Sequence, residues 1–173
     1  MPRHILLSGV HGVGKGYFIR NKLANIKQLT VISASEIISQ YHNAEDAGNK
    51  RVKNVGDNQK ILLDVLSGYY FSRNEKILLD GHLVILDSDD NIQRIPIAFF
   101  DKGMFDTLII LQDDPQKIYD RLYKRDGIHK LEIDLISKIQ ENEKKYAMEL
   151  EQIGVDVYYI TPLSEESEYM HIF

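Results

Sequence analysis

A glycine cluster near the N-terminus constrains the fold of this chain more than any other feature. Four of the 11 glycines lie within the eight residues Gly9–Gly16, which read GVHGVGKG. The apolar run His4–Ser8 comes just before the cluster and predicts a short buried strand. Lys15 to about Asn25 follows as a predicted helix. A glycine-rich turn between a strand and a helix is the setting of a phosphate-binding loop.

The chemistry of such a loop explains each residue type. Glycines let backbone N–H groups turn toward an anion, and the helix N-terminus adds positive potential. Lys15 supplies a mobile positive charge. The predicted nucleotide-binding residues are Gly9, His11, Gly12, Val13, Gly14, Lys15, Gly16 and Tyr17. The alternative is a glycine-rich turn without a ligand, and it requires both the lysine and the strand–helix setting to be accidental.

Short apolar runs alternate with helical patterns along the rest of the chain. Four further strands are predicted at Thr30–Ser33, Lys76–Leu79, Thr107–Leu111 and Asp156–Ile160, with a small hairpin from His82–Leu86 and Ile92–Ile95. Helices are predicted at Glu36–Gln40 capped by Ser35, at Asp57 to about Phe71, after Asp114-Pro115, and at about Glu132 to Ile153. The stretch Tyr41–Val55 reads as an exposed loop, and Ser164–Phe173 has no assignment. The alternation predicts an α/β fold, the three-layer α/β/α arrangement of P-loop NTPases with a five-stranded parallel sheet.

Composition narrows the class of protein. With 173 residues, of which 43% are hydrophobic and 27% charged, the chain suits one compact domain. The absence of cysteine excludes disulfides, a thiolate zinc site and a cysteine nucleophile. No apolar run approaches the length of a membrane span and no signal peptide is evident, so we expect a cytoplasmic protein without a membrane partner. The net charge of -5 argues against broad binding to nucleic acid.

The residues after the lysine narrow the class of phosphate loop. The general motif has Ser or Thr there to bind Mg²⁺, whereas this chain has Gly16. The loop GVHGVGKGYF resembles that of adenylate kinases and related nucleoside monophosphate kinases, in which glycine follows the lysine and magnesium is held mainly through water. Tyr17 departs from that family, which has Thr at this position. The resemblance implies ATP and Mg²⁺ as cofactors.

The resemblance extends from about Ile5 to Ile160. Adenylate kinases carry Asp-Gly after the third strand and archaeal-type enzymes carry Asp-Thr-His, and this chain has Asp80-Gly81-His82. An acidic residue at this strand end can orient water bound to Mg²⁺. The resemblance therefore implies that Asp80 holds the metal through water. A turn residue before glycine is the alternative role.

Arginines on one helix give a further match. Arg121 and Arg125 are one turn apart, so both guanidinium groups project from one helix face. The family carries two arginines at this spacing, and such a pair can stabilise charge on the transferring phosphoryl group. A solvated basic face is the alternative. With the phosphate loop, the predicted catalytic residues are Lys15, Asp80, Arg121 and Arg125.

The acceptor side matches the family least. Within a single domain spanning residues 1–173, acceptor-binding helices are expected at about 34–72 and a short lid loop at about 125–131. Ser39 stands where the family has the arginine that holds the acceptor phosphate. The candidate acceptor-binding residues are Ser35, Lys53, Gln59, His82 and Arg94.

These motifs favour an ATP-dependent kinase that transfers the γ-phosphoryl group to a nucleoside monophosphate or a similar small acceptor. If the acceptor group is a hydroxyl, Asp80 is the candidate base and His82 its neighbour. The alternative is a nucleotide-dependent ATPase or switch that acts on a partner, which Tyr17 and the missing acceptor arginine favour. A nucleic-acid kinase is a third possibility, but this chain lacks the interleaving of aromatic and basic residues that it would need. The acceptor and the oligomeric state stay open at this point.

Overall fold

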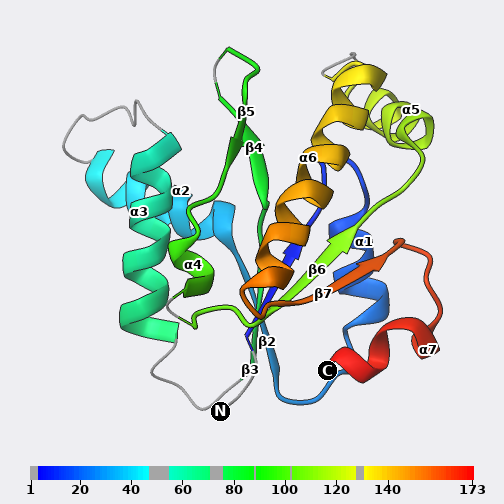
Figure 1. Ribbon diagram of the computed structural model, residues 1–173. Helices are drawn as coiled ribbons and strands as arrows, with labels where there is room; N and C mark the ends of the chain where they lie inside the picture. The colour runs from blue at the N-terminus through cyan, green and yellow to red at the C-terminus, as the bar shows by residue number, and fades with distance from the viewer. Residues whose placement is uncertain (1–3, 47–54, 71–75, 88, 102, 128–130) are drawn as a thin grey trace.

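The computed structural model describes the chain except for residues 1–3, 47–54, 71–75, 88, 102 and 128–130. Its centre is a five-stranded sheet with the strand order β2–β3–β1–β6–β7 (Figure 1), and every neighbouring pair in it is parallel. The strands are β1 (Ile5–Ser8), β2 (Leu29–Ser33), β3 (Lys76–Asp80), β6 (Thr107–Leu111) and β7 (Asp156–Ile160). The predicted parallel sheet is confirmed.

Helices flank both faces of this sheet. In Figure 1, α1 (Lys15–Lys22) lies behind the sheet and α6 (Ile133–Gln152) lies in front of it. The other helices are α2 (Ala34–Asp46), α3 (Val55–Val65), α4 (Ala98–Asp101), α5 (Pro115–Asp126) and α7 (Glu166–Tyr169), with a π-helical turn at Leu66–Tyr70 and a 3-10 turn at Met170–Ile172. The predicted α/β class with three layers is confirmed.

Alternating strand residues divide the core into two halves. Ile5 and Leu7 of β1 pack on the side of Phe18 from α1, whereas Leu6 packs on the opposite side with Leu150 from α6. Successive side chains of a strand point to opposite faces of the sheet. Because helices cover both faces, β1 and β6 are buried at every position. This explains their almost uninterrupted apolar sequences.

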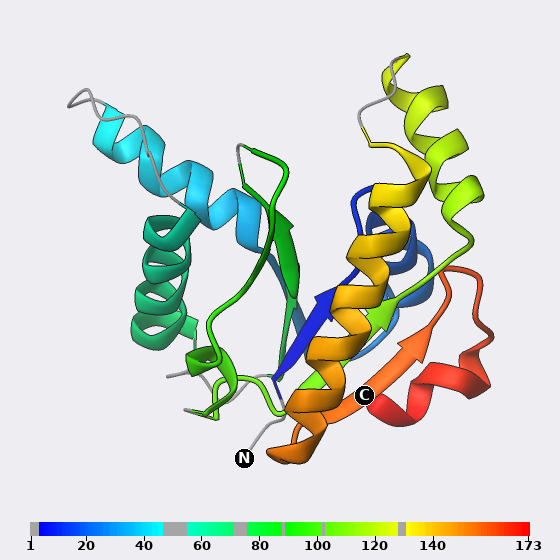
Figure 2. The same ribbon diagram turned by 45° about the horizontal axis from the view of Figure 1, so that its top comes forward.

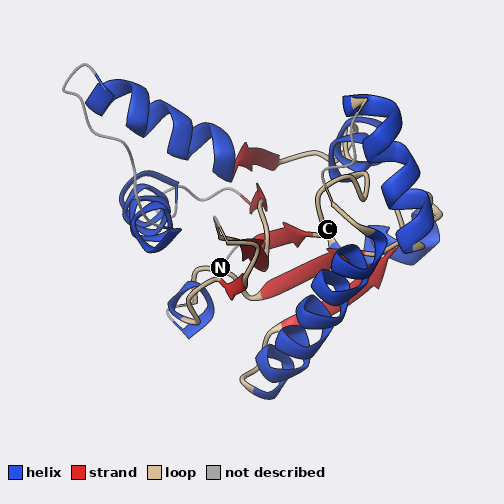
Figure 3. Cartoon of the chain, turned by 90° about the horizontal axis from the view of Figure 1, so that it is seen from above, coloured by secondary structure: helices blue, strands red, loops and turns tan. Residues whose placement is uncertain are grey.

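A small hairpin stands above the carboxyl edge of the sheet. It consists of β4 (Val84–Leu86) and β5 (Ile92–Arg94), which pair antiparallel as predicted. Figure 2 shows this hairpin between α2 and α3 on one side and α5 and α6 on the other. The view from above gives the same arrangement (Figure 3). The hairpin therefore separates two regions over the strand ends.

The region after β2 differs from the sequence prediction. α2 runs through residues 41–46, so the prediction of an exposed loop from Tyr41 is wrong there, while residues 47–54 lie outside the described chain. No glycine or proline interrupts residues 34–46, and the helix continues through polar residues. The N-terminal cap is also different. Ser33 Oγ, and not Ser35, accepts a hydrogen bond from the Glu36 N–H at 3.3 Å.

The C-terminal segment, which the sequence left unassigned, folds as α7 and the short turn after it. Tyr169 of α7 is 1% exposed and packs edge-on against Phe18, with ring centroids 5.2 Å apart. This contact fixes α7 beside α1, the helix that follows the glycine loop. The tail therefore completes the core behind the loop.

Candidate functional site

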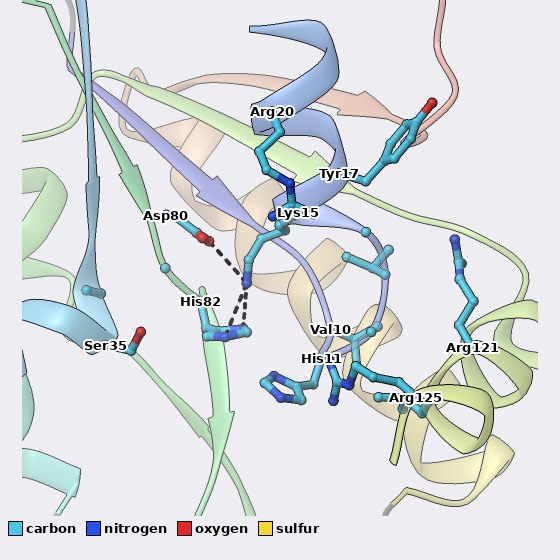
Figure 4. Close-up of a pocket in the computed structure, with 17 residues that line it drawn as sticks. Val10, His11, Lys15, Tyr17, Arg20, Ser35, Asp80, His82, Arg121 and Arg125 are labelled. Atoms are coloured by element: carbon cyan, nitrogen blue, oxygen red, sulfur yellow. Dashed lines mark hydrogen bonds and ion pairs between the residues drawn. The ribbon is translucent and has the colours of Figure 1, made fainter. Parts of the chain in front are cut away.

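A pocket of about 480 Å³ lies at the carboxyl edge of the sheet. Figure 4 shows that residues from the glycine loop, from the start of α2, from the end of β3 and from α5 meet there. The sequence-predicted residues that line it are His11, Gly12, Val13, Gly14, Lys15, Gly16, Tyr17, Ser35, Asp80, His82, Arg121 and Arg125. Ligands of parallel α/β sheets bind at this edge. The fold thus brings together residues that lie more than a hundred positions apart in the sequence.

The glycine loop has a backbone that requires glycine at two positions. Gly12 and Gly14 have φ angles of 84° and 112°, which side chains rarely adopt. A Cβ at Gly12 would lie 2.6 Å from Leu122 Cγ, and a Cβ at Gly14 would lie 3.0 Å from Pro162 Cγ. Gly14 directly precedes α1, so the free N–H groups of the first helical turn open onto the pocket. The loop therefore has the strand–loop–helix geometry of a P-loop.

The ammonium group of Lys15 is held by residues that follow β3. Its Nζ lies 3.2 Å from His82 Nε2, 3.5 Å from Nδ1 of the same ring and 3.4 Å from Asp80 Oδ1. His82 Nδ1 lies 2.9 Å from the Gly9 carbonyl oxygen. Because a carbonyl oxygen only accepts, Nδ1 carries the proton, and Nε2 is the ring nitrogen that can accept from Lys15. This assigns the tautomer of His82.

Electrostatics agree with a neutral His82. Burial, with the nearby charges of Lys15 and His11, lowers the pKa of His82 to about 3. Burial also lowers the pKa of Lys15 below its ordinary value, although the carboxyl groups of Asp80 and Glu143 oppose this shift. The site therefore presents a partly desolvated ammonium held by a neutral acceptor and one carboxylate. Charged phosphate oxygens would be stronger hydrogen-bond acceptors for that ammonium than the neutral imidazole is.

The two arginines of α5 have different partners. Arg121 Nη2 donates to Asp113 Oδ2 at 2.6 Å. Gln140 braces that aspartate, because its side chain accepts from the Asp113 N–H at 3.1 Å and donates to the Asp113 carbonyl at 3.0 Å. Arg125 pairs with its chain neighbour Asp126 at 2.8 Å. Arg121 is therefore anchored to the framework, whereas Arg125 is tied to its own helix end.

Three predicted acceptor residues lie together. Ser35 and His82 line the main pocket and also an adjoining pocket of about 120 Å³, which Gln59 lines as well. The side chain of Gln59 is only 8% exposed, and its Oε1 is buried without a hydrogen-bond partner in the described structure. An unpaired buried amide oxygen costs free energy. A ligand that donates a hydrogen bond would remove this cost.

The other two predicted acceptor residues are not brought into this group. Arg94 pairs with Glu149 at 2.7 Å and lies 4.7 Å above the centre of the Tyr146 ring. It lines neither of the two adjoining pockets. Lys53 lies outside the described residues. The expected lid at 125–131 begins within α5, which ends at Asp126, and its residues 128–130 are also outside the described chain.

Sequence reasoning misses two residues of this region. Arg20 lines the main pocket (Figure 4), and its Nη1 lies 3.1 Å from the position that a Cβ at Gly16 would take. The signal is the spacing of four residues, which puts Arg20 one helical turn beyond a residue without a side chain. Glu143 is fully buried on α6 behind the loop. In the sequence it only interrupts an apolar series.

A magnesium ion fits the residues present when it arrives with a nucleotide. Among the described residues, no group of three or more His, Cys, Asp or Glu could hold a metal ion. Asp80 supplies the carboxylate of the main pocket, with its side chain 28% exposed to water. Mg²⁺ usually keeps several waters and binds one or two carboxylates together with substrate phosphates. This donor set suits such an ion and not an all-protein cage.

Comparison with known proteins assigns the chain to a family. Residues 8–140, which hold the glycine loop and both arginines of α5, match the sequence profile of the family described as "AAA domain". The chain belongs to this AAA domain family. Comparison with the curated proteins finds no significant match. Among the described residues of this chain, no helix is long and apolar enough to cross a membrane.

Two solved structures share the fold. A gluconokinase from Sinorhizobium meliloti 1021 is 13% identical, with a TM-score of 0.55, and the alignment covers 98% of this chain and 88% of that one. The tunicamycin resistance protein of Deinococcus radiodurans is 14% identical, with a TM-score of 0.61, covering 90% and 97%. At these identities the likeness shows the fold alone. The AAA domain chain thus has a P-loop NTPase-like fold.

Proposed function

We propose that this protein is an ATP-dependent kinase that transfers the γ-phosphoryl group of ATP to a nucleoside monophosphate or a similar small acceptor. The main support for this proposal is that the pocket of the glycine loop adjoins a second pocket. Ser35 and His82 line both pockets. A donor and an acceptor bound in adjoining pockets are held for direct transfer. A protein that only binds or hydrolyses ATP has no need of the second pocket.

The loop and Lys15 form the donor side of this proposal. The backbone N–H groups of the loop would cradle the phosphates, and Lys15 would exchange His82 for phosphate oxygens. Asp80 would hold Mg²⁺ through water, and the ion would neutralise charge on the phosphates. Arg121 and Arg125 face the same pocket, so they would stabilise the charge that spreads over the transferred group. Arg20 adds a further positive charge on the side of Lys15.

The second pocket suits part of an acceptor molecule. Its walls include Ile38, Leu62 and Phe99, and Gln59 contributes the unpaired amide oxygen. A planar ring with an N–H group, such as a nucleobase, would contact the apolar walls and donate to that oxygen. A phosphate acceptor needs little base catalysis. If a hydroxyl accepts the phosphoryl group instead, Asp80 would take its proton.

A specific observation favours the alternative, an ATPase or switch that acts on a partner. Among the described residues that line the second pocket, none is Lys or Arg. A phosphate group is held best by a positioned guanidinium, and Arg94 is engaged elsewhere with Glu149. The two functions differ in whether ADP formation depends on an acceptor.

A coupled assay of ADP formation separates these functions. MgATP is supplied alone, with each nucleoside monophosphate, and with gluconate as a hydroxyl acceptor. ADP formation that depends on one monophosphate supports the nucleotide kinase, and dependence on gluconate supports a hydroxyl kinase. A rate of ADP formation that is the same with and without each added acceptor supports the ATPase.

The second pocket is tested by substitution of Gln59. Gln59→Leu should raise the KM for the acceptor and leave the affinity for MgATP unchanged, because Gln59 lines only the second of the two adjoining pockets. Gln152→Leu, at the exposed end of α6, is the matched control. An unchanged KM in Gln59→Leu would exclude this pocket as the acceptor site.

A further inference from the structure

A fully buried carboxyl group lies behind the phosphate loop. Glu143 of α6 has 0% exposure, and its helix neighbours Ile139, Tyr146 and Leu150 are buried as well. Only one of its carboxyl oxygens has a partner in the described structure, since Oε2 is buried without a hydrogen bond. Burying a half-satisfied carboxyl group costs free energy that an apolar side chain of similar size would avoid. Packing of the core therefore does not explain this residue.

Glu143 is linked to the site through Ser8. The Ser8 Oγ–H donates to Glu143 Oε1 at 2.6 Å, and Ser8 Oγ itself accepts from the Leu83 N–H at 2.6 Å. Ser8 ends β1 and directly precedes the glycine loop, whereas Leu83 follows His82. The two bonds thus join α6, the start of the loop and the segment after β3.

The chain neighbours of this network make the contacts that hold Lys15. Gly9, next to Ser8, accepts the hydrogen bond from His82 Nδ1, and His82, next to Leu83, accepts the hydrogen bond from Lys15. A shift of either backbone segment would move the imidazole and with it the lysine. Ser8 is 0% exposed, so bulk solvent does not compete for these bonds. Glu143 does not line the main pocket, so these bonds are its connection to the site.

We propose that Glu143 is a positioning residue of the phosphate site. Through Ser8 it fixes the backbone on both sides of the contact between Gly9 and His82, and it thereby sets the ammonium of Lys15 for an incoming phosphate. This inference rests on the proposed nucleotide-binding function. The effect of Glu143 on the position of His82 can be measured in the free protein, without a nucleotide.

The charge of Glu143 adds a dependence on pH. Burial raises its pKa to about 7, against the Ser8 hydrogen bond and the charge of Lys15, which lower it. Lys15 of α1 is the charged group that acts on Glu143, and Asp80 and His82 in turn face Lys15. An ionised Glu143 would attract Lys15 and repel phosphates. Nucleotide affinity should therefore fall as the pH rises through about 7.

The test compares variants on one helix by two readouts. The ¹⁵N signals of the His82 ring report its tautomer in the free protein, and calorimetry reports the Kd for a magnesium complex of a non-hydrolysable ATP analogue. Glu143→Leu should change the ring signals and weaken binding by about 10-fold to 100-fold. Glu143→Gln keeps an acceptor for Ser8, so it should restore the ring signals and most of the affinity, and the fall of affinity above pH 7 should vanish.

Leu150→Ala is the control for a purely structural effect, because it removes a buried apolar group from the same helix without touching the network. It should lower the Tm and leave both readouts unchanged. Ser8→Ala cuts the network at its centre and serves where Glu143→Leu does not fold. Ring signals and a Kd that respond to Glu143→Leu no more than to Leu150→Ala would overturn the proposal.

Two further outcomes separate a failure of the Glu143 proposal from a failure of the proposed function. A Glu143→Gln protein as impaired as Glu143→Leu would also overturn the proposal, because the amide keeps the contact with Ser8. If the unaltered protein binds no nucleotide analogue while the His82 ring still responds to Glu143, the proposed function fails and the placement of His82 by Glu143 stands.

Discussion

Lys15 donates a hydrogen bond to a neutral His82, with Nζ 3.2 Å from Nε2. The histidine is fixed in turn by its own donation to the Gly9 carbonyl at 2.9 Å. The ammonium of Lys15 is therefore directed into the pocket by a neutral partner together with the carboxylate of Asp80, which lies 3.4 Å away. Because the imidazole is a weaker acceptor than a phosphate oxygen, the lysine can leave it when a nucleotide binds.

Replacing His82 by leucine tests this relationship. The change removes both the donor to Gly9 and the acceptor of Lys15, so the affinity for a magnesium–nucleotide complex should fall by about 10-fold. The free energy of unfolding should fall by about 1–3 kcal/mol, since a buried carbonyl loses its donor. Calorimetry and urea denaturation measure the two effects. His171→Leu on the C-terminal turn is the control, and equal affinities in the two variants would contradict the assignment.

Glycine substitutions separate backbone strain from steric clash. Gly12 and Gly127 both have positive φ, 84° and 70°, but only Gly12 has a neighbour among the described residues within 4 Å of an added Cβ. Gly127→Ala should therefore cost about 1 kcal/mol of stability from strain alone. Gly12→Ala should cost more, because its methyl group would lie 2.6 Å from Leu122 Cγ, and it should also abolish nucleotide binding. Equal losses of stability in urea denaturation would show that the Leu122 contact is absent.

The arrangement of strands and the glycine loop could be predicted from the sequence, because both depend on local patterns. Apolar runs of four or five residues identify β1 and β6, and glycine spacing with Lys15 identifies the loop. Helix α2 could not be delimited in this way, since its second half is polar and one buried residue, Ile37, anchors its first half. Tertiary contacts and not periodicity decide such a boundary.

Most residues of the main pocket can be predicted, because they follow a strand or lie in the helix after one. The links between them could not be predicted. Pairs such as Ser8 and Glu143 are 135 positions apart, and a single sequence gives no sign of such a contact. The contact between His82 and Lys15 could not be predicted for the same reason. The sequence suggests a place for His82 beside the acceptor, and the structure adds the contact with Lys15.

The pKa of Glu143 predicts how stability changes with pH. The ordinary pKa of the carboxyl is 4.5, and burial raises that of Glu143 to about 7. Between these values the folded protein keeps a proton that the unfolded chain releases. The stabilisation is therefore complete below pH 4.5 and is lost as the pH rises through about 7, by on the order of 3 kcal/mol.

The measurement compares urea denaturation of the unaltered protein and Glu143→Gln from pH 4.5 to 8. The lowered pKa of His82 changes stability in the opposite sense between about pH 3 and 6.5, so only the difference between the two proteins isolates Glu143. As the pH rises, the free energy of unfolding of the unaltered protein should fall relative to that of Glu143→Gln. A difference that stays constant over this range would mean that Glu143 has an ordinary pKa.

The arginines of α5 should act on the rate and not on stability. Arg121 and Arg125 both line the main pocket, with side chains 40% and 52% exposed. Exposed ion pairs contribute about 0–1 kcal/mol, so Arg121→Gln and Arg125→Gln should unfold almost as the unaltered protein does. The rate of phosphoryl transfer should fall by about 100-fold or more in each variant, if the guanidinium stabilises the transition state. Lys124→Gln, an exposed change on the same helix, is the control, and rates equal to it would remove the arginines from catalysis.

Lys15 is tested by isothermal titration with a magnesium complex of a non-hydrolysable ATP analogue. The titration compares the unaltered protein with Lys15→Ala and with Lys22→Ala, which alters the far end of the same helix. We predict that the unaltered protein and Lys22→Ala bind alike, that Lys15→Ala binds at least about 100-fold more weakly, and that all three keep the same Tm within a few degrees. Equal affinity of Lys15→Ala and the unaltered protein would contradict the assignment of this pocket to nucleotide phosphates.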